Sequence, residues 1–379
     1  MQPITAYTLP PDKLALAEQY ALARHILYFA AYAVSAIVLV LLIRFRVAPR
    51  LRGHRLPVVI AAIYAITTAF DLPAEMCGHA LSLHYGISIE RWPAWFADWF
   101  KGQAIAFPLT ILLVSAFYLL VRRRPQRWWL YAWMACVPLI LFSVWVDPFV
   151  IEPLFNDFQP LAKEHANLIA PIEGVLHCAN VSIPADRLFE MRASDKTTAL
   201  NAYVSGFGSS KRVVLYDTII RAEPEPALMT TFGHELGHYV LAHIPKGIGY
   251  ASITLLIGFY LAYAIMRWFV ARAGPRFDVT GAGDPGSLPV FALIALVLSF
   301  LADPVANAYS RRQEHQADAY SLGVVRCVVA DPGQAAAQAF QIEGERDLEP
   351  PDPNPFVVFW LYSHPPVADR LRFSLAYKP

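Results

Sequence analysis

The chain has 379 residues, of which 56% are hydrophobic and only 16% are charged. Ordinary soluble domains carry about 25% charged residues, so this composition excludes a typical soluble domain and favours a membrane protein. The 31 basic and 30 acidic residues nearly balance, whereas nucleic-acid binding requires a basic surface. We therefore expect a lipid bilayer as a partner, and no nucleic acid.

Six apolar segments predict membrane spans, because a helix needs about 20 predominantly apolar residues to cross a bilayer. They are residues 26–43, 56–70, 104–121, 129–146, 248–266 and 288–302. The second is short, and we expect it to continue past Asp71 and Pro73 to about residue 83 as an amphipathic extension. The predicted fold is therefore mainly α, a polytopic bundle of about six spans.

Three connecting loops are rich in arginine, at residues 44–55, 122–127 and 267–276. With the spans above, all three loops fall on one side of the membrane, and the positive-inside rule makes that side cytoplasmic. Both termini and the polar segments 147–247 and 303–379 then lie on the extracytoplasmic side. The compact size and the short arginine-rich loops suggest a multi-pass protein of a bacterial inner membrane.

The chain divides into four parts along these lines. Residues 1–146 form a membrane region with four spans, 147–247 a first polar part, 248–302 two further spans and 303–379 a second polar part. In the first polar part we expect a helix at 161–179, a strand at 188–193 and a hairpin of 201–207 with 211–219. A further helix begins near Pro224 and runs to about His243, where Pro245 ends it. The second polar part contains helices at 305–323 and 332–343 and a short C-terminal helix.

The four cysteines, Cys77, Cys136, Cys178 and Cys327, are widely separated. No Cys-x-x-Cys pair occurs, so the sequence supports neither a thiolate metal site nor a disulfide framework. We expect Cys77 and Cys136 to lie in or near spans as small apolar residues.

The stretch His234-Glu235-Leu236-Gly237-His238 indicates a metal site. Positions four apart share one face of a helix, so both imidazoles can reach one zinc ion. Glu235 then lies beside the metal, where it can accept a proton from water. Amide hydrolysis needs this combination of a Lewis acid and a base.

A third ligand is expected because a catalytic zinc usually has three protein ligands and a water. Glu314 is the best candidate, since its helix leaves the last span as the motif helix enters the span before it. Asp318 lies on the same helical face and can orient a zinc-bound histidine or donate a proton. The alternative for both carboxylates is a solvated face or a salt bridge with Arg311 or Arg312. His243 lies off the ligand face, which favours a capping or surface role.

These residues resemble the motifs of a known family, the type I CAAX prenyl proteases, which are integral-membrane zinc metallopeptidases also called a-factor-converting enzymes. The resemblance includes the strand segments 201–207 and 211–218, the third-ligand helix at 307–318, and Ser363-His364-Pro365-Pro366 followed by Arg370. It covers most of the chain from about residue 56 onward. The family usually has seven spans, so on this resemblance we expect an early one to be missing here.

The resemblance implies a gluzincin-like peptidase domain with a small β-sheet and a role for each motif residue. The implied ligands of one zinc ion are His234, His238 and Glu314. The implied general base is Glu235, and the implied proton donor is Asp318. The residues expected to hold the extended substrate are Asn201, Tyr203, His364 and Arg370, and either of the last two can stabilise the oxyanion.

Two other interpretations stay open at the level of sequence. A site-two-type intramembrane protease also uses His-Glu-Leu-Gly-His, but there the motif lies inside a span and an Asp-Gly motif supplies the third ligand. Here Asp303 is followed by Pro304, not by glycine. A non-enzymatic membrane quality-control scaffold would close a structural zinc with four protein ligands, mostly Cys and His. We expect the peptidase, acting as a monomer on peptides or membrane-associated proteins.

Overall fold

The computed structural model describes residues 3–378 and consists mainly of long helices. Six of the described helices are long and apolar enough to cross a membrane: α1 (Pro11–Arg44), α3 (Leu56–His84), α4 (Trp92–Arg123), α5 (Trp128–Val150), α11 (His243–Arg272) and α13 (Leu288–Val324). They confirm the six predicted spans, and α3 continues through Pro73 as expected. The protein is therefore a multi-pass, mainly α membrane protein.

The outer surfaces of these six helices carry exposed hydrophobic side chains, as membrane spans do. Leu112 on α4 is 65% exposed and Ile253 on α11 is 63% exposed, as expected where hydrocarbon surrounds a helix. Between the helices, the fully buried ring of Trp128 packs edge-on against Phe291, with centroids 5.5 Å apart. The bundle therefore has a packed interior and large hydrophobic side chains on its outer surface.

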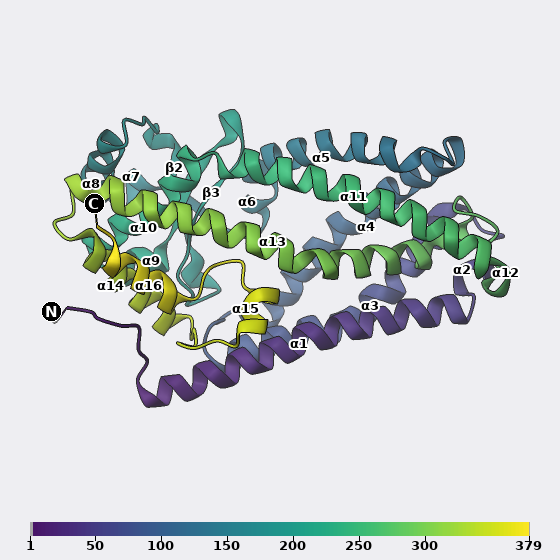
Figure 1. Cartoon of the computed structure of the whole chain (residues 1–379), viewed down its shortest axis with the longest axis horizontal. Coiled ribbons are helices and arrows are strands. Elements are labelled where there is room, and N and C mark those ends of the chain that lie inside the picture. The colour runs from purple at the N-terminus through teal and green to yellow at the C-terminus, as the bar shows by residue number, and fades with distance from the viewer. Residues whose placement is uncertain (1–2, 379) are drawn as a thin grey trace.

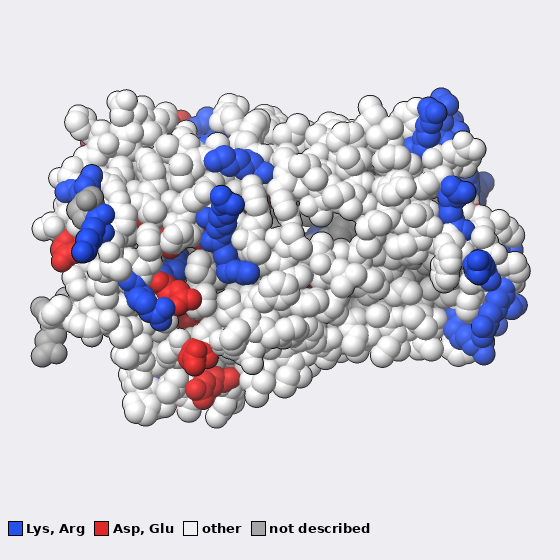
Figure 2. Space-filling model, viewed as in Figure 1, with Lys and Arg blue, Asp and Glu red and all other residues white. Residues whose placement is uncertain are grey.

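The two ends of the bundle differ in charge. The short helices α2 (Val47–Arg50) and α12 (Gly274–Phe277) lie at one end, and both chain termini lie at the other (Figure 1). Figure 2 shows basic side chains gathered at the α2 and α12 end and few charged side chains in the middle of this face. Arg52 fixes that end by donating to the buried carboxylate of Asp284 at 2.8 Å.

A four-stranded sheet lies in the polar part of the molecule. Its strands are β1 (Phe158–Pro160), β2 (Leu188–Met191), β3 (Ala202–Ser205) and β4 (Arg212–Tyr216), in the spatial order β1-β2-β4-β3. The predicted hairpin is confirmed, because β3 and β4 pair antiparallel, but residues 217–219 belong to helix α9 (Asp217–Ala222). β3 is an edge strand, and its outer edge has no partner among the described strands.

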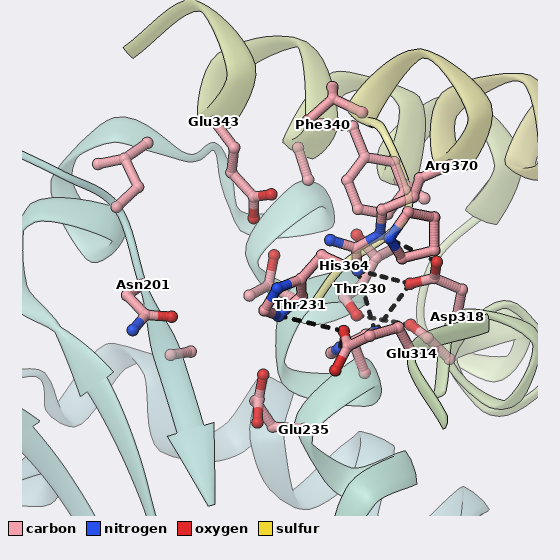
Figure 3. Close-up of a pocket in the computed structure, with 18 of the residues that line it drawn as sticks. Asn201, Thr230, Thr231, Glu235, Glu314, Asp318, Phe340, Glu343, His364 and Arg370 are labelled. Atoms are coloured by element: carbon pink, nitrogen blue, oxygen red, sulfur yellow. Dashed lines mark hydrogen bonds and ion pairs between the residues drawn. The ribbon is translucent and has the colours of Figure 1, made fainter. Parts of the chain in front are cut away.

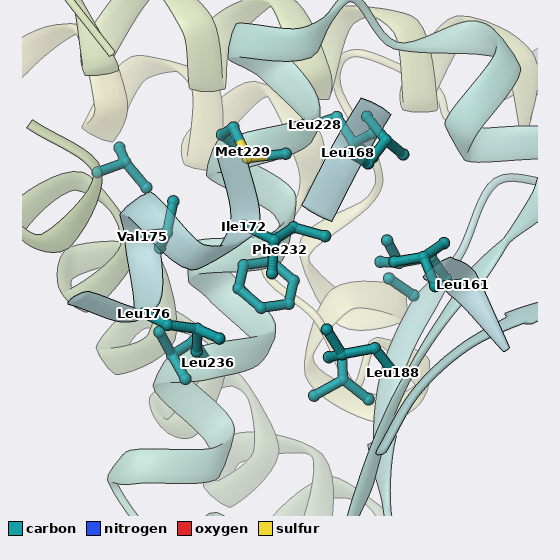
Figure 4. Close-up of a cluster of buried hydrophobic side chains, with 14 of the residues drawn as sticks. Leu161, Leu168, Ile172, Val175, Leu176, Leu188, Leu228, Met229, Phe232 and Leu236 are labelled. Atoms are coloured by element: carbon teal, nitrogen blue, oxygen red, sulfur yellow. The ribbon is translucent and has the colours of Figure 1, made fainter. Parts of the chain in front are cut away.

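The remaining helices complete the polar part of the molecule. They are α6 (Glu152–Phe155), α7 (Leu161–Glu164), α8 (Ala166–Cys178), α10 (Glu225–Val240), α14 (Pro332–Arg346), α15 (Pro355–Leu361) and α16 (Val367–Ala376). The predicted helix at 161–179 is thus two helices, which meet at His165. Ile172 of α8 and Phe232 of α10 are fully buried in a core that the sheet shares with α7, α8, α9, α10 and α14 (Figure 4). This core holds the motif helix in place.

The predicted end of the motif helix was wrong. α10 ends at Val240, and Ala242 adopts a left-handed conformation before α11 begins at His243. Pro245 therefore lies in the first turn of α11, where a missing N–H costs nothing because that group has no helical partner. The break turns the chain from the polar domain directly into a span.

The cysteine expectation was wrong for one pair. Cys178, at the end of α8, and Cys327, just after α13, form a disulfide with their Cα atoms 6.6 Å apart. Their sequence separation of 149 residues gives no spacing signal, and only the fold brings α8 beside the end of α13. The bridge joins the two polar parts of the chain. Cys77 and Cys136 are free and lie on α3 and α5, as expected.

Candidate active site

Two helices bring the three predicted ligands together. The ligand atoms of His234, His238 and Glu314 all lie within 4.8 Å of one another. His234 Nε2 is 3.1 Å from His238 Nε2 and 3.2 Å from a carboxylate oxygen of Glu314. Two imidazoles and one carboxylate facing a common point form the donor set that binds a catalytic zinc ion.

Glu314 supplies an observation that tests this fit. Its Oε2 atom is buried and has no hydrogen-bond partner among the described residues, although His234 Nε2 lies 3.2 Å and His364 Nε2 3.4 Å away. A buried carboxylate oxygen without a hydrogen bond is costly. A cation bound between Glu314 and the two histidines would remove this cost, so the residues present fit a metal ion.

The glycines of α10 explain why α13 can approach so closely. A Cβ atom on Gly237 would lie 3.0 Å from Ala317 Cα, and one on Gly233 would lie 2.8 Å from Ser321 Oγ. Ala317 and Ser321 follow Glu314 on α13 and lie four residues apart on one helical face, as Gly233 and Gly237 do on α10. Small residues on α10 therefore set the distance between the histidines and Glu314.

Glu235 lies beside the three ligands in the same cavity. The residue is buried, and its carboxylate faces the space between β3 and the ligand group (Figure 3). Burial raises the pKa of Glu235 to about 6, while His234 and His238 favour its charged form. A carboxylate in this position can accept a proton near neutral pH.

Asp318 links His234 to Arg370. His234 Nδ1 lies 2.8 Å from Asp318 Oδ1, and Arg370 donates to both oxygens of Asp318, at 3.0 and 2.7 Å. A carboxylate on Nδ1 fixes the ring so that Nε2 faces the ligand position. These contacts favour the orienting role of Asp318 over proton donation, because the guanidinium stabilises the ionised carboxylate.

One contact of the site was missed at the sequence level. His243 is buried, its Nδ1 lies 3.0 Å from Nδ1 of His238, and its Nε2 lies 3.3 Å from Gln316 Oε1. The expected surface or capping role for His243 is wrong. The sequence did not predict this contact, because the motif helix was expected to run through His243. The left-handed turn at Ala242 instead brings the ring of His243 toward His238.

The three ligands, Glu235 and Asp318 line a cavity of about 630 Å³. Its walls are β3, α10, α13, α14 and the segment from Leu361 to Arg370. Asn201 lines it at the start of β3, opposite the ligand group (Figure 3). Tyr203 also lines it, but its hydroxyl donates to Glu152 at 2.8 Å. The structure thus brings all nine predicted site residues to one cavity.

This fold and site define a multi-pass membrane metallopeptidase. Two family models match the chain: "Peptidase family M48" over residues 162–376 and "CAAX prenyl protease N-terminal, five membrane helices" over residues 4–157. The chain belongs to peptidase family M48, and the predicted kinship with CAAX prenyl proteases is confirmed. It is therefore a hydrolase that acts on peptides or proteins.

Relatives extend the likeness over nearly the whole chain. An uncharacterized metalloprotease of Bacillus subtilis, YhfN, is 33% identical over 97% of this chain and 86% of its own. A CAAX prenyl protease 1 homolog of Oryza sativa is 28% identical over 79% of this chain and 68% of its own. The crystal structure of S. mikatae Ste24p superposes with a TM-score of 0.82 at 21% identity, covering 97% of this chain and 90% of that one, which confirms the fold.

The two alternative interpretations lose their support. The motif lies on α10, before the span-forming helix α11, and Glu314 is the carboxylate that completes the ligand group. A site-two-type arrangement would place the motif inside a span. The peptidase family match replaces the scaffold interpretation with an enzyme.

Proposed function

We propose that the chain is a zinc-dependent endopeptidase with one metal ion held by His234, His238 and Glu314. The observation that carries the proposal is the convergence of these three ligands in a cavity that also holds Glu235. When bound, the ion would supply Lewis-acid chemistry toward a substrate carbonyl and a water. Glu235 accepts the proton of the attacking water.

We propose that the substrate binds as an extended strand along the free edge of β3. Edge strands present unpaired N–H and C=O groups, so a peptide can add to them by main-chain hydrogen bonds. Asn201 and Tyr203 lie on this side of the cavity. Asn201 is the better placed to contact a peptide, because the hydroxyl of Tyr203 is already bonded to Glu152.

His364 and Arg370 take different parts in this proposal. The His364 side chain is 61% exposed at the cavity and lies near Glu314, so it can donate to a substrate carbonyl on which negative charge develops. Arg370 is bound to both oxygens of Asp318. We therefore assign Arg370 the positioning of Asp318 and, through it, of His234.

We also propose that the catalytic part faces away from the cytoplasm of a bacterial inner membrane and that the protein acts as a monomer. The arginine-rich loops gather at the end opposite the cavity (Figures 1 and 2). The disulfide between Cys178 and Cys327 lies at the cavity end, and disulfides persist in oxidising compartments such as the periplasm. Two independent features thus support one orientation.

The proposed substrates are peptides or membrane-associated proteins. An internally quenched peptide, incubated with the purified protein in detergent, tests the metal dependence of cleavage. We expect a chelator to abolish cleavage and added zinc to restore it, with the products identified by mass. Cleavage that continues at the same rate in protein shown to be free of metal would refute the proposal.

A further inference from the structure

A second group of acidic side chains lines the cavity, apart from the metal ligands. Glu343 extends from α14, and Asp347 and Glu349 follow just after it. We call these three residues the acidic wall. Figure 3 shows the Glu343 carboxylate facing the space between Asn201 on β3 and the ligand group. A peptide lying along β3 would therefore pass the acidic wall.

The acidic wall has no cationic partner of its own. Among residues 3–378, none of its three carboxylates forms an ion pair with a lysine or arginine, and Asp347 accepts one hydrogen bond, from the Leu200 N–H at 3.2 Å. Arg370 is the basic residue whose charge acts most strongly on Glu343, but its Nε and Nη2 atoms donate to Asp318. The acidic wall thus contains three carboxyl groups without a direct ion-pair partner.

A fourth carboxylate, Glu223, interacts with Glu343 of the acidic wall. Glu223 is only 5% exposed, and its Oε2 accepts a hydrogen bond from the cavity residue Thr231 at 2.9 Å. Its buried Oε1 has no hydrogen-bond partner among the described residues, and Glu343 is the charged group that acts on it most strongly. Two carboxylates that face each other away from water require either a shared proton or a cation.

The pKa shifts of these carboxyl groups agree with their burial. Burial raises the pKa of each carboxyl in the acidic wall, that of Asp347 to about 8. Burial and the neighbouring Glu343 also raise the pKa of Glu223. Burial thus disfavours the charged form of each carboxyl, and a cation beside them would offset this cost with a favourable charge pair.

We propose that the acidic wall is a specificity subsite for a cationic group of the substrate, an ammonium or guanidinium, presented by a peptide bound along β3. The proposal rests on the proposed peptidase function and names the substrate class that the cavity prefers. The cation can come from a lysine or arginine side chain or from a free N-terminal amine. All three present N–H donors that suit buried carboxylates.

The test compares quenched peptides that differ only in lysine, arginine or norleucine at one position, scanned along the sequence, with free and acetylated N-termini. At one position we expect wild-type kcat/KM to be at least about tenfold higher for a basic residue than for norleucine. A fall in kcat/KM on acetylation, without a preference for a basic side chain, would identify the N-terminal amine as the cation. No preference for a basic residue at any position, and no effect of acetylation, would refute the proposal.

Variants of one helix locate the subsite. Glu343→Gln should reduce the preference for the basic peptide to about twofold or less, and Glu343→Lys should favour an acidic residue instead. Glu345→Gln is the matched control, because Glu345 lies on the same helix and pairs with Lys13 outside the cavity; it should keep the wild-type preference. A Glu343→Gln enzyme with the full wild-type preference would overturn the assignment.

Inhibition of the wild-type protein by a small cation tests the subsite without relying on the folding of a variant. Agmatine, a small guanidinium compound, should inhibit wild-type cleavage competitively, and butanol at equal concentration should not. Equal inhibition by the two compounds would contradict the subsite. If wild-type protein cleaves none of the peptides while loaded with zinc, the peptidase proposal itself fails, which separates the two outcomes.

Discussion

At the residue scale, the spacing of the motif predicted the first two ligands and the base, because i and i+4 share a helical face whatever the surrounding fold. Glu314 and Asp318 could be proposed from spacing and topology. The contact of His243 with His238 could not, since it depends on a left-handed turn at Ala242. A contact that depends on an irregular turn produces no helical spacing in the sequence by which it could be predicted.

Replacing Asp318 with Asn separates its two possible roles. Because Asp318 holds Nδ1 of His234, we expect the metal affinity to fall by about 10- to 100-fold, together with kcat/KM. Competition with a metal-binding dye measures the affinity. Asp369→Asn is the control, as Asp369 is exposed on α16 and pairs with Arg372. Wild-type metal affinity with lost activity would instead support proton donation.

Asp347 predicts a pH dependence of stability. An unfolded aspartate titrates near pH 4, whereas Asp347 in the fold has a pKa of about 8. Between these values the folded state binds more protons, so the contribution of Asp347 to stability falls as pH rises, by at most about 1.4 kcal/mol per pH unit.

The comparison with Asp347→Asn isolates this contribution, because asparagine keeps an acceptor for the Leu200 N–H. Thermal unfolding in detergent at pH 5.5 and pH 8 measures it. We expect the midpoint of the variant to exceed that of the wild type by more at pH 8 than at pH 5.5. A difference that stays constant or shrinks toward pH 8 would contradict the raised pKa.

At the element scale, hydrophobic runs predicted the spans well, because a run of apolar residues has few structures open to it in a bilayer. The short elements were predicted less well. Residues 217–219 were expected to extend a strand but begin α9, and Pro245 was expected to end a helix but lies in the first turn of the next. Short segments take their structure from tertiary packing, which the local sequence does not encode.

The close packing of α10 against α13 gives a prediction at this scale. Gly237→Ala places a methyl group about 3.0 Å from Ala317 Cα, and we expect it to destabilise the protein by about 1–3 kcal/mol and to weaken metal binding by separating the ligands. Gly247→Ala on α11 is the control, since no atom lies within 4 Å of its added Cβ. A Gly237→Ala protein with wild-type melting temperature and metal content would contradict this account of the ligand spacing.

At the scale of the whole molecule, six helices carry charged loops at one end and a peptidase cavity at the other (Figure 1). The arginine-rich loops of the sequence predicted this difference between the two ends. The sequence could not predict the bridge between Cys178 and Cys327, because residues 149 positions apart meet only in the folded domain. The bridge and the arginine loops lead to the same proposed orientation.

Reporter fusions test that orientation. Alkaline phosphatase, which needs an oxidising compartment to form its disulfides, should be active when fused after the C-terminus and inactive when fused within residues 122–127. A reporter that requires the cytoplasm should show the opposite pattern. Cytoplasmic reporter activity at the C-terminus would refute the proposed orientation.

The central claim is that Glu235 acts as the base beside a metal held by His234, His238 and Glu314. The most direct measurement is kcat/KM of the Glu235→Gln variant, with bound metal determined in the same sample and Glu225→Gln, on the exposed start of the same helix, as the control. We predict that Glu235→Gln keeps its metal and loses about 100- to 10,000-fold in kcat/KM, while Glu225→Gln retains full activity. A metal-loaded Glu235→Gln enzyme that cleaves the peptide at the wild-type rate would contradict the account.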